Sequence, residues 1–188
     1  MSTVENKLAN PAPLGLMAFG MTTVLLNLHN AGFFPTTSVV LAMGIFFGGL
    51  AQVVAGIMEF SKGNTFGVTA FTSYGFFWLT LVATWVLPIL GVDEAQAPSK
   101  AYLGCYLALW GVFTFFMFLG TFKSSRVLQF VFISLAVLFF LLAIRDFTHN
   151  EFIGALAGYV GLLCGALAMY LSMAEVMDAQ YGRKVLPY

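Results

Sequence analysis

The sequence predicts an all-α, polytopic membrane protein in which six transmembrane helices form one compact bundle. Hydrophobic residues make up 60% of the 188-residue chain and charged residues only 9%, whereas a soluble domain usually carries about 25% charged residues. Six long uncharged runs follow one another, and a membrane-crossing helix needs about 20 mostly apolar residues. A chain this apolar cannot cover its own surface in water, so the lipid bilayer is its expected solvent.

Helix starts and stops divide the chain into the six spans. The first span begins near Asn10-Pro11, because asparagine caps helix starts and proline suits the first helical position. Only Lys7 precedes this span as a basic residue, and no small-residue cleavage pattern closes it, so it is read as a span rather than a signal peptide. The spans are expected at residues 13–29, 38–59, 68–90, 101–121, 127–144 and 152–174 of a single membrane domain, 1–188.

Charges and turn-forming residues separate the later spans. Connections this short make neighbouring spans antiparallel. The breaks are Ala31-Gly32 with Pro35, then residues 61–64, Asp93-Glu94 with Pro98, residues 123–126 and residues 145–151.

The distribution of basic residues predicts the orientation of the bundle. An even number of spans places both termini on one side, together with the second and fourth connections. By the positive-inside rule, the side with more lysine and arginine faces the cytoplasm, so both termini are expected to be cytoplasmic. That side carries Lys7, Lys62, Lys123, Arg126, Arg183 and Lys184, and the other carries Lys100 and Arg145.

Small residues recur at intervals that suit close helix packing. Such stripes let membrane helices approach closely, either within a protomer or between protomers. The second span carries Gly44, Gly48, Gln52 and Gly56, and the sixth carries Gly154, Gly158, Gly161, Gly165, Ala168 and Ser172. The two cysteines, Cys105 and Cys164, are isolated in apolar runs and are expected to be packing residues. With zero net charge and no phosphate-binding loop, neither a cofactor nor a nucleic-acid partner is expected.

Weakly polar side chains are the candidates for lining a solute pathway. No Asp, Glu, Lys or Arg lies near the middle of a span, which argues against a carboxylate proton relay at the midplane. Hydroxyl and amide groups can bind a small solute without trapping it, although they equally serve as hydrogen bonds between helices. The candidates are Thr22, Thr23, Asn27, Gln52, Thr72 and Ser73.

Two sequence blocks carry a family resemblance. The heptapeptide Asn10-Pro11-Ala12-Pro13-Leu14-Gly15-Leu16 and the segment 63–75, which reads Gly-Asn-Thr-Phe-Gly and then Thr-Ala-Phe-Thr-Ser-Tyr-Gly after Val68, resemble the acetate uptake transporters, or succinate–acetate permeases. The resemblance covers nearly the whole chain. It implies acetate and succinate as substrates, protons as a coupling partner, and a homohexamer in the bacterial inner membrane with one pathway in each protomer.

The resemblance also implies a narrow apolar constriction of three side chains. These fall on Phe19, Tyr74 and Leu135, and a small residue tied to substrate size falls on Ala168. Spacing provides an independent check. At about 1.5 Å of rise per residue, these four residues and Gln52 lie roughly 9–12 Å from the inner ends of their helices, in one layer.

These observations predict a proton-coupled uptake system for small carboxylates. In this hypothesis Tyr74 donates a hydrogen bond to the carboxylate, while Phe19 and Leu135 contact the methyl group. The apolar ring disfavours a bare anion, which favours co-movement of a proton. The alternative is a passive anion channel.

A membrane-embedded enzyme or an assembly protein is the remaining class. An enzyme would need a nucleophile with a base, or a metal cluster, inside the bundle, and the sequence shows neither. His29 and His149 lie in outer connections, with no further metal ligands beside them.

Overall fold

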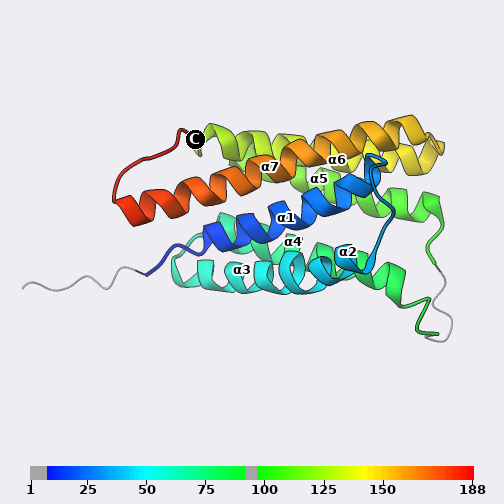
Figure 1. Ribbon diagram of the computed structural model, residues 1–188, viewed down its shortest axis with the longest axis horizontal. Helices are drawn as coiled ribbons and strands as arrows, with labels where there is room; N and C mark the ends of the chain where they lie inside the picture. Colours follow the sequence, from blue (N-terminus) through cyan, green and yellow to red (C-terminus); the bar gives the residue numbers. More distant parts are fainter. Residues whose placement is uncertain (1–7, 92–96) are drawn as a thin grey trace, which may run out of the picture.

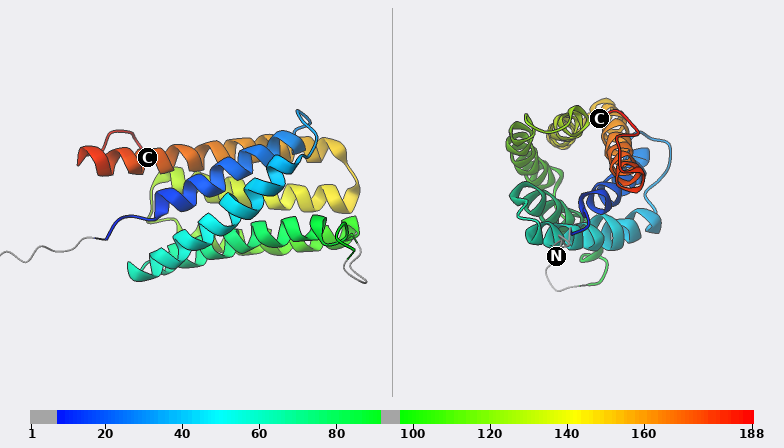
Figure 2. Two further views of the ribbon diagram at one scale, coloured as in Figure 1. Left: turned by 60° about the horizontal axis from the view of Figure 1, so that its bottom comes forward. Right: turned by 90° about the vertical axis from the view of Figure 1, so that its left-hand side faces the viewer.

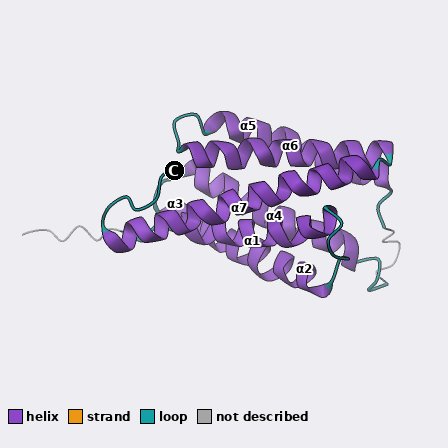
Figure 3. Ribbon diagram, turned by 45° about the horizontal axis from the view of Figure 1, so that its top comes forward, coloured by secondary structure: helices purple, strands orange, loops and turns teal. Residues whose placement is uncertain are grey.

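The computed structural model contains six helices, among the residues it describes, that are long and apolar enough to cross a membrane (Figures 1 and 3). This confirms the predicted fold class. The structure describes residues 8–91 and 97–188, and within them the regular elements are all helical. Lys7, Asp93 and Glu94, which entered the sequence argument, lie outside these ranges. The elements are α1 Ala12–Asn30, α2 Ser38–Ala42, η1 Met43–Ala51, α3 Gln52–Ser61, α4 Thr65–Val86, α5 Lys100–Gly120, α6 Arg126–Thr148 and α7 Glu151–Tyr181.

The helix ends follow local capping chemistry. Asn64 caps α4 by accepting a hydrogen bond from the backbone N–H of Gly67 at 3.1 Å, so α4 begins at Thr65, earlier than the expected residue 68. It ends at Val86, just ahead of Pro88, whose ring excludes a helical continuation. At the other extreme, α7 runs on to Tyr181. Its 31 residues make it about 46 Å long, so it extends beyond a hydrocarbon core of about 30 Å.

The second span changes its helical type midway. α2, η1 and α3 follow one another without a break, and η1 is a nine-residue π-helix. Its glycines lie against neighbouring helices: a Cβ on Gly44 would lie 2.6 Å from Val82, and a Cβ on Gly48 would lie 2.8 Å from Thr22. π-Helical segments often mark functional sites, and this one ends immediately before Gln52.

The spans are arranged as a ring around a central axis (Figure 2, right). Going around it, α1 lies against α7, α7 against α6, α6 against α5, and the second span lies between α4 and α1. The ring closes where α4 meets α5. There, Phe77 of α4 packs edge-on against Trp110 of α5 at 5.2 Å between ring centroids, and Thr80 lies 2.8 Å from the hydroxyl of Tyr106.

The predicted small-residue stripe of the sixth span packs against α1 within the same protomer. A Cβ on Gly165 would lie 2.8 Å from the backbone oxygen of Gly20, and one on Gly158 would lie 2.7 Å from the Cα of Ala31. Further along, the hydroxyl of Ser172 donates to the backbone oxygen of Pro13 at 2.6 Å. The two helices therefore form a closely packed wall of the ring.

We predict that Gly158→Ala destabilises this wall by about 1–3 kcal/mol, because the added methyl group meets backbone atoms that cannot rotate away. Thermal unfolding of the purified protein in detergent measures the effect. Gly120→Ala is the matched control, since its Cβ would meet only the side chain of Phe66, at 3.3 Å. Equal melting temperatures for the two variants would contradict the prediction.

Candidate functional site

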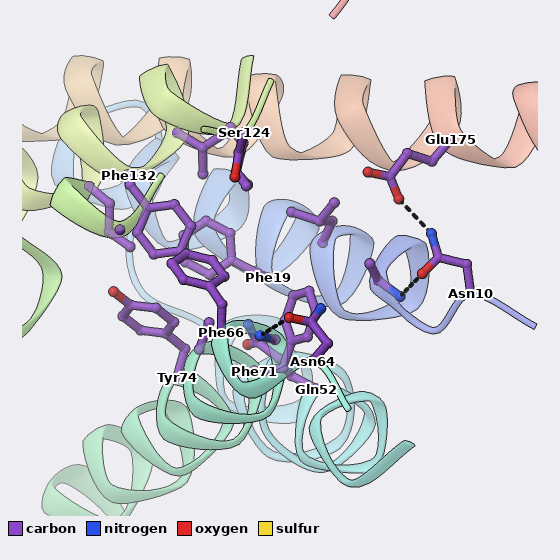
Figure 4. Close-up of a pocket in the computed structure, with 18 residues that line it drawn as sticks. Asn10, Phe19, Gln52, Asn64, Phe66, Phe71, Tyr74, Ser124, Phe132 and Glu175 are labelled. Carbon is purple, nitrogen blue, oxygen red and sulfur yellow. Dashed lines mark hydrogen bonds between the residues drawn. The ribbon is translucent and has the colours of Figure 1, made fainter. Parts of the chain in front are cut away.

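A cavity of about 340 Å³ lies inside the ring at the end of the bundle that carries both termini (Figures 1 and 4). Segments from all around the ring line it, including the turns that precede α1, α4 and α6. From α1, the second span and α4 these are Asn10, Ala12, Leu16, Phe19, Gln52, Asn64, Phe66, Gly67, Ala70, Phe71 and Tyr74. From α5 to α7 they are Gly120, Ser124, Leu128, Val131, Phe132, Leu135 and Glu175.

The deep end of the cavity is closed by apolar and aromatic side chains. The rings of Phe19 and Tyr74 lie 6.0 Å apart, and those of Tyr74 and Phe132 lie 6.1 Å apart. Leu135, 3% exposed, lines the same cavity. The structure therefore brings together the three residues expected at the constriction, from α1, α4 and α6, and adds Phe132.

A hydrogen bond fixes the position of the Tyr74 ring. The Tyr74 hydroxyl donates to Oγ1 of Thr114 at 2.9 Å, and Thr114 in turn donates to the backbone oxygen of Trp110 at 2.7 Å. The only proton of the tyrosine hydroxyl is thus directed at α5 rather than into the cavity. Thr114 is fully buried, and it is not among the site residues predicted from the sequence.

Gln52 provides an amide at the same depth. It begins α3 directly after the π-helical turn, lines the cavity and is 1% exposed. Its Oε1 has no hydrogen-bond partner among the described residues. A buried amide without a partner is costly, so this group is suited to bind a polar solute or water in the cavity.

The wide end of the cavity is polar. The amide of Asn10 donates to Oε2 of Glu175 at 2.9 Å (Figure 4). Nζ of Lys62 donates to Oδ1 of Asn10 at 3.3 Å. Asn64 lies nearby on the α3–α4 turn and donates to the buried carboxylate of Glu59 at 2.8 Å. Asn10, Asn64 and Glu175 therefore form the polar mouth of the cavity, and none of the three was selected as a lining residue from the sequence.

The sequence motif at residues 10–16 contributes to the cavity in several ways. Asn10, Ala12 and Leu16 line it, and Gly15 leaves room for the Phe71 ring, since a Cβ there would lie 2.5 Å from that ring. Pro11 precedes the first helical residue, and Pro13 accepts the hydrogen bond from α7. Leu14 is 39% exposed and faces away.

The other predicted polar residues of α1 lie outside the cavity lining. Thr22 donates to the backbone oxygen of Ala18 at 2.8 Å, and Asn27 donates to that of Thr23 at 2.9 Å, so both are used within α1. Thr23 has a buried hydroxyl without a partner among the described residues. Thr22, the first of these three residues, lies about one helical turn beyond Phe19, so all three lie past the floor of the cavity.

Thr72 and Ser73 of α4 also lie outside the lining. Thr72 packs against Gly56 of α3, whereas Ser73 borders a shallow outer groove beside Tyr106 and Trp110. Successive helical residues point about 100° apart, so neither can share the direction of Tyr74. Ala168 is fully buried in the core but is not a lining residue.

Spacing along α6 could have identified lining residues that the sequence analysis missed. Leu128, Val131, Phe132 and Leu135 follow the i, i+3, i+4, i+7 pattern of one helix face. The surrounding residues of α6 are also apolar. The pattern therefore becomes visible only when Leu135 is known to face the cavity. No group of three or more His, Cys, Asp or Glu side chains that could hold a metal ion occurs among residues 8–91 and 97–188.

A ring of membrane helices around a cavity with a polar mouth and an apolar floor defines a membrane protein built around a solute pathway. The chain matches the GPR1/FUN34/yaaH family over residues 1–187, and it belongs to that family. The resemblance inferred from the segments 10–16 and 63–75 is thereby confirmed, and the chain is a multi-pass protein of the bacterial inner membrane.

Several relatives carry names that describe transport. The chain is 64% identical to the succinate-acetate/proton symporter SatP of Escherichia coli strain K12, over 97% of this chain and 96% of that protein. It is 33% identical to acetate permease A of Emericella nidulans, over 99% of this chain and 67% of that protein. The solved structure of the bacterial acetate channel SatP superposes with a TM-score of 0.94 at 64% identity, covering 96% of this chain and 99% of that one.

We predict that the Tyr74–Thr114 hydrogen bond stabilises the constriction. Thr114→Val leaves the buried tyrosine hydroxyl without an acceptor, which costs about 1–3 kcal/mol. Tyr74→Phe removes the hydroxyl itself, so the double variant should lose less stability than the sum of the two single changes. Thermal unfolding of all four proteins in detergent completes the cycle. Additive losses would show that the two groups do not interact.

Proposed function

We propose that this protein carries acetate across the membrane through the cavity of each protomer. The observation that supports this most directly is the arrangement of the cavity itself: amide groups at its mouth and depth, and an apolar ring at its floor. Its volume of about 340 Å³ falls in the usual range for small-ligand pockets, roughly 300–1,000 Å³. The names of the symporter, the permease and the channel among its relatives support the same substrate.

The cavity suits a carboxylate that must pass without being trapped. Gln52 provides a side-chain amide at the level of the ring, and Asn10 and Asn64 provide amides at the mouth. Neutral donors of this kind bind an anion less tightly than a lysine or arginine does, and conduction requires binding that is weak enough to release the solute. Because Tyr74 donates to Thr114, Gln52 takes the role of carboxylate donor in this proposal, and the Tyr74 ring contributes to the wall.

The apolar ring selects solutes by size and by hydration. In this proposal Phe19, Tyr74 and Leu135 contact the methyl group of acetate as it passes, and the small side chain of Ala168, buried in the same core cluster, leaves room for the ring. Removing water from a bare carboxylate in such a ring is costly, so transfer of a proton with the substrate lowers the barrier. Succinate has two carboxyl groups, so each of them needs a proton to lower the cost of losing its water in the ring.

Two modes of transport follow from the same cavity. One is uptake of acetate and succinate coupled to protons, as the name of the 64% identical symporter suggests. The other is a passive anion channel, as the name of the superposed structure suggests. In either mode we infer that both termini and the cavity mouth face the cytoplasm, and that the protein assembles as a homohexamer.

The decisive experiment is uptake of labelled acetate into proteoliposomes that hold the purified protein, with and without an inward-directed proton gradient. Accumulation above equilibrium, driven by the gradient, is the expected result for proton-coupled transport. Flux that only equilibrates identifies a channel. No flux above that of protein-free liposomes refutes the transport proposal.

We predict that Leu135→Ala widens the constriction, so that uptake of a longer monocarboxylate such as butyrate rises several-fold relative to acetate. Ala168→Val should do the reverse, because the added methyl groups push neighbouring side chains toward the ring, and succinate uptake should fall more than acetate uptake. Competition for labelled-acetate uptake measures both ratios.

Leu163→Ala provides the matched control for these variants. Leu163 is a leucine of α7 that is 57% exposed and lies away from the cavity. If the solute size limit of the Leu135 and Ala168 variants stays equal to that of this control, the ring does not select substrates.

A further inference from the structure

Glu175 places an ionisable carboxyl group at the mouth of a cavity that, under the proposed function, admits anions. It is the single charged residue among the described residues that line the cavity, and the other polar lining side chains are neutral amides and hydroxyls. Nearby, Lys62 is directed at Asn10 rather than into the cavity. The local charge therefore opposes the solute, unless the carboxyl group is protonated.

The position of Glu175 is fixed by its hydrogen bond to Asn10. That residue precedes α1, whereas Glu175 lies in the last turns of α7, so the bond spans the cavity mouth between two helices (Figure 4). An amide N–H donates to a carboxylate and, more weakly, to the carbonyl oxygen of a protonated carboxyl. The contact therefore persists in both protonation states, and protonation changes the charge at the mouth without releasing the side chain.

The charged groups around Glu175 come from several elements. Glu59 of α3 and Asp178 of α7 disfavour a negative charge on it, whereas Lys62 of the α3–α4 turn favours one. Tyr188 of the C-terminal segment also lies within electrostatic reach. The surroundings of Glu175 thus combine two further carboxyl groups, those of Glu59 and Asp178, with the ammonium group of Lys62.

We propose that the protonation state of Glu175 controls access of carboxylate anions to the cavity, so that the pathway conducts when Glu175 is neutral and closes electrostatically when it is ionised. This inference rests on the proposed acetate transport and adds the group that sets its pH dependence. Two unit charges about 8 Å apart, at an effective dielectric constant of about 20, repel each other enough to lower occupancy on the order of tenfold or more.

The direction of the pH dependence follows from the repulsion between ionised Glu175 and the carboxylate solute. Flux is full at low pH, where Glu175 is neutral, and falls as pH rises through its titration. From about pH 6 upward acetate itself is almost entirely ionised, as carboxylates with an unperturbed pKa near 4 are. The neutral acid, by contrast, falls about tenfold with each further pH unit, so the part of a fall in flux that Glu175 causes is the part that its neutralisation removes.

The test is tracer exchange of labelled acetate in proteoliposomes with equal pH on both sides, from pH 6 to pH 8. Exchange at equal pH requires no net proton movement, so it is measurable for a symporter and for a channel. After the flux of protein-free liposomes is subtracted, wild-type exchange should fall more steeply with pH than exchange by Glu175→Gln, which keeps the acceptor for Asn10 but is always neutral. The ratio of the two rates cancels the titration of acetate itself and isolates the effect of the Glu175 charge.

Two further variants separate charge from structure. Glu175→Asp keeps the ionisable group and should retain a fall with pH. Glu151→Gln, which neutralises an exposed carboxyl group at the opposite end of α7, should behave as wild type. If Glu175→Gln keeps the wild-type pH profile, the inference is wrong while acetate transport stands. If wild type shows no exchange at any pH, the proposed function itself fails.

Discussion

The hydroxyl of Tyr74 and its acceptor Thr114 form the contact on which the architecture of the cavity depends. Tyr74 is 3% exposed, and its ring lies within 6.1 Å of aromatic rings from α1, α5 and α6. One side chain therefore joins α4 to three other helices at the floor of the cavity. Because α4 and α5 meet mainly through aromatic side chains, this hydrogen bond also helps to close the ring of helices.

The two sides of the ring are built on different physical principles. On one side, glycines of α7 bring its backbone against that of α1, as at Gly165 and Gly20, and backbone contacts of this kind leave little freedom for movement. On the other side, aromatic rings such as Phe77 and Trp110 fill the space between α4 and α5. Aromatic side chains can rotate where backbones cannot. The contact between α4 and α5 is therefore made by side chains, whereas that between α1 and α7 is made by backbone.

The sequence predicts the fold well because hydrophobic length and the charged breaks between spans are strong signals in a bilayer. The family resemblance selects Phe19, Tyr74 and Leu135, and all three line the cavity; their role as a constriction stays a prediction. The sequence does not predict the π-helix, since Met43–Ala51 is an apolar run with three glycines, like other parts of the spans. It also misleads on Ser73 and Thr22. A hydroxyl at the depth of the cavity can point away from it. It can also donate its hydrogen bond to a backbone oxygen of its own helix, as Thr22 does to Ala18.

The chemistry of the cavity balances solvation of an anion against its release. Fixed cations would hold a carboxylate tightly, and a wholly apolar path would exclude it. The cavity instead offers amides, one at the depth of the ring on Gln52 and two at the mouth on Asn10 and Asn64. Amide dipoles bind weakly and do not titrate, so these groups do not themselves make binding depend on pH. The carboxyl group of Glu175 at the mouth is the acidic side chain of the described lining, and its charge adds a pH dependence to that of the substrate.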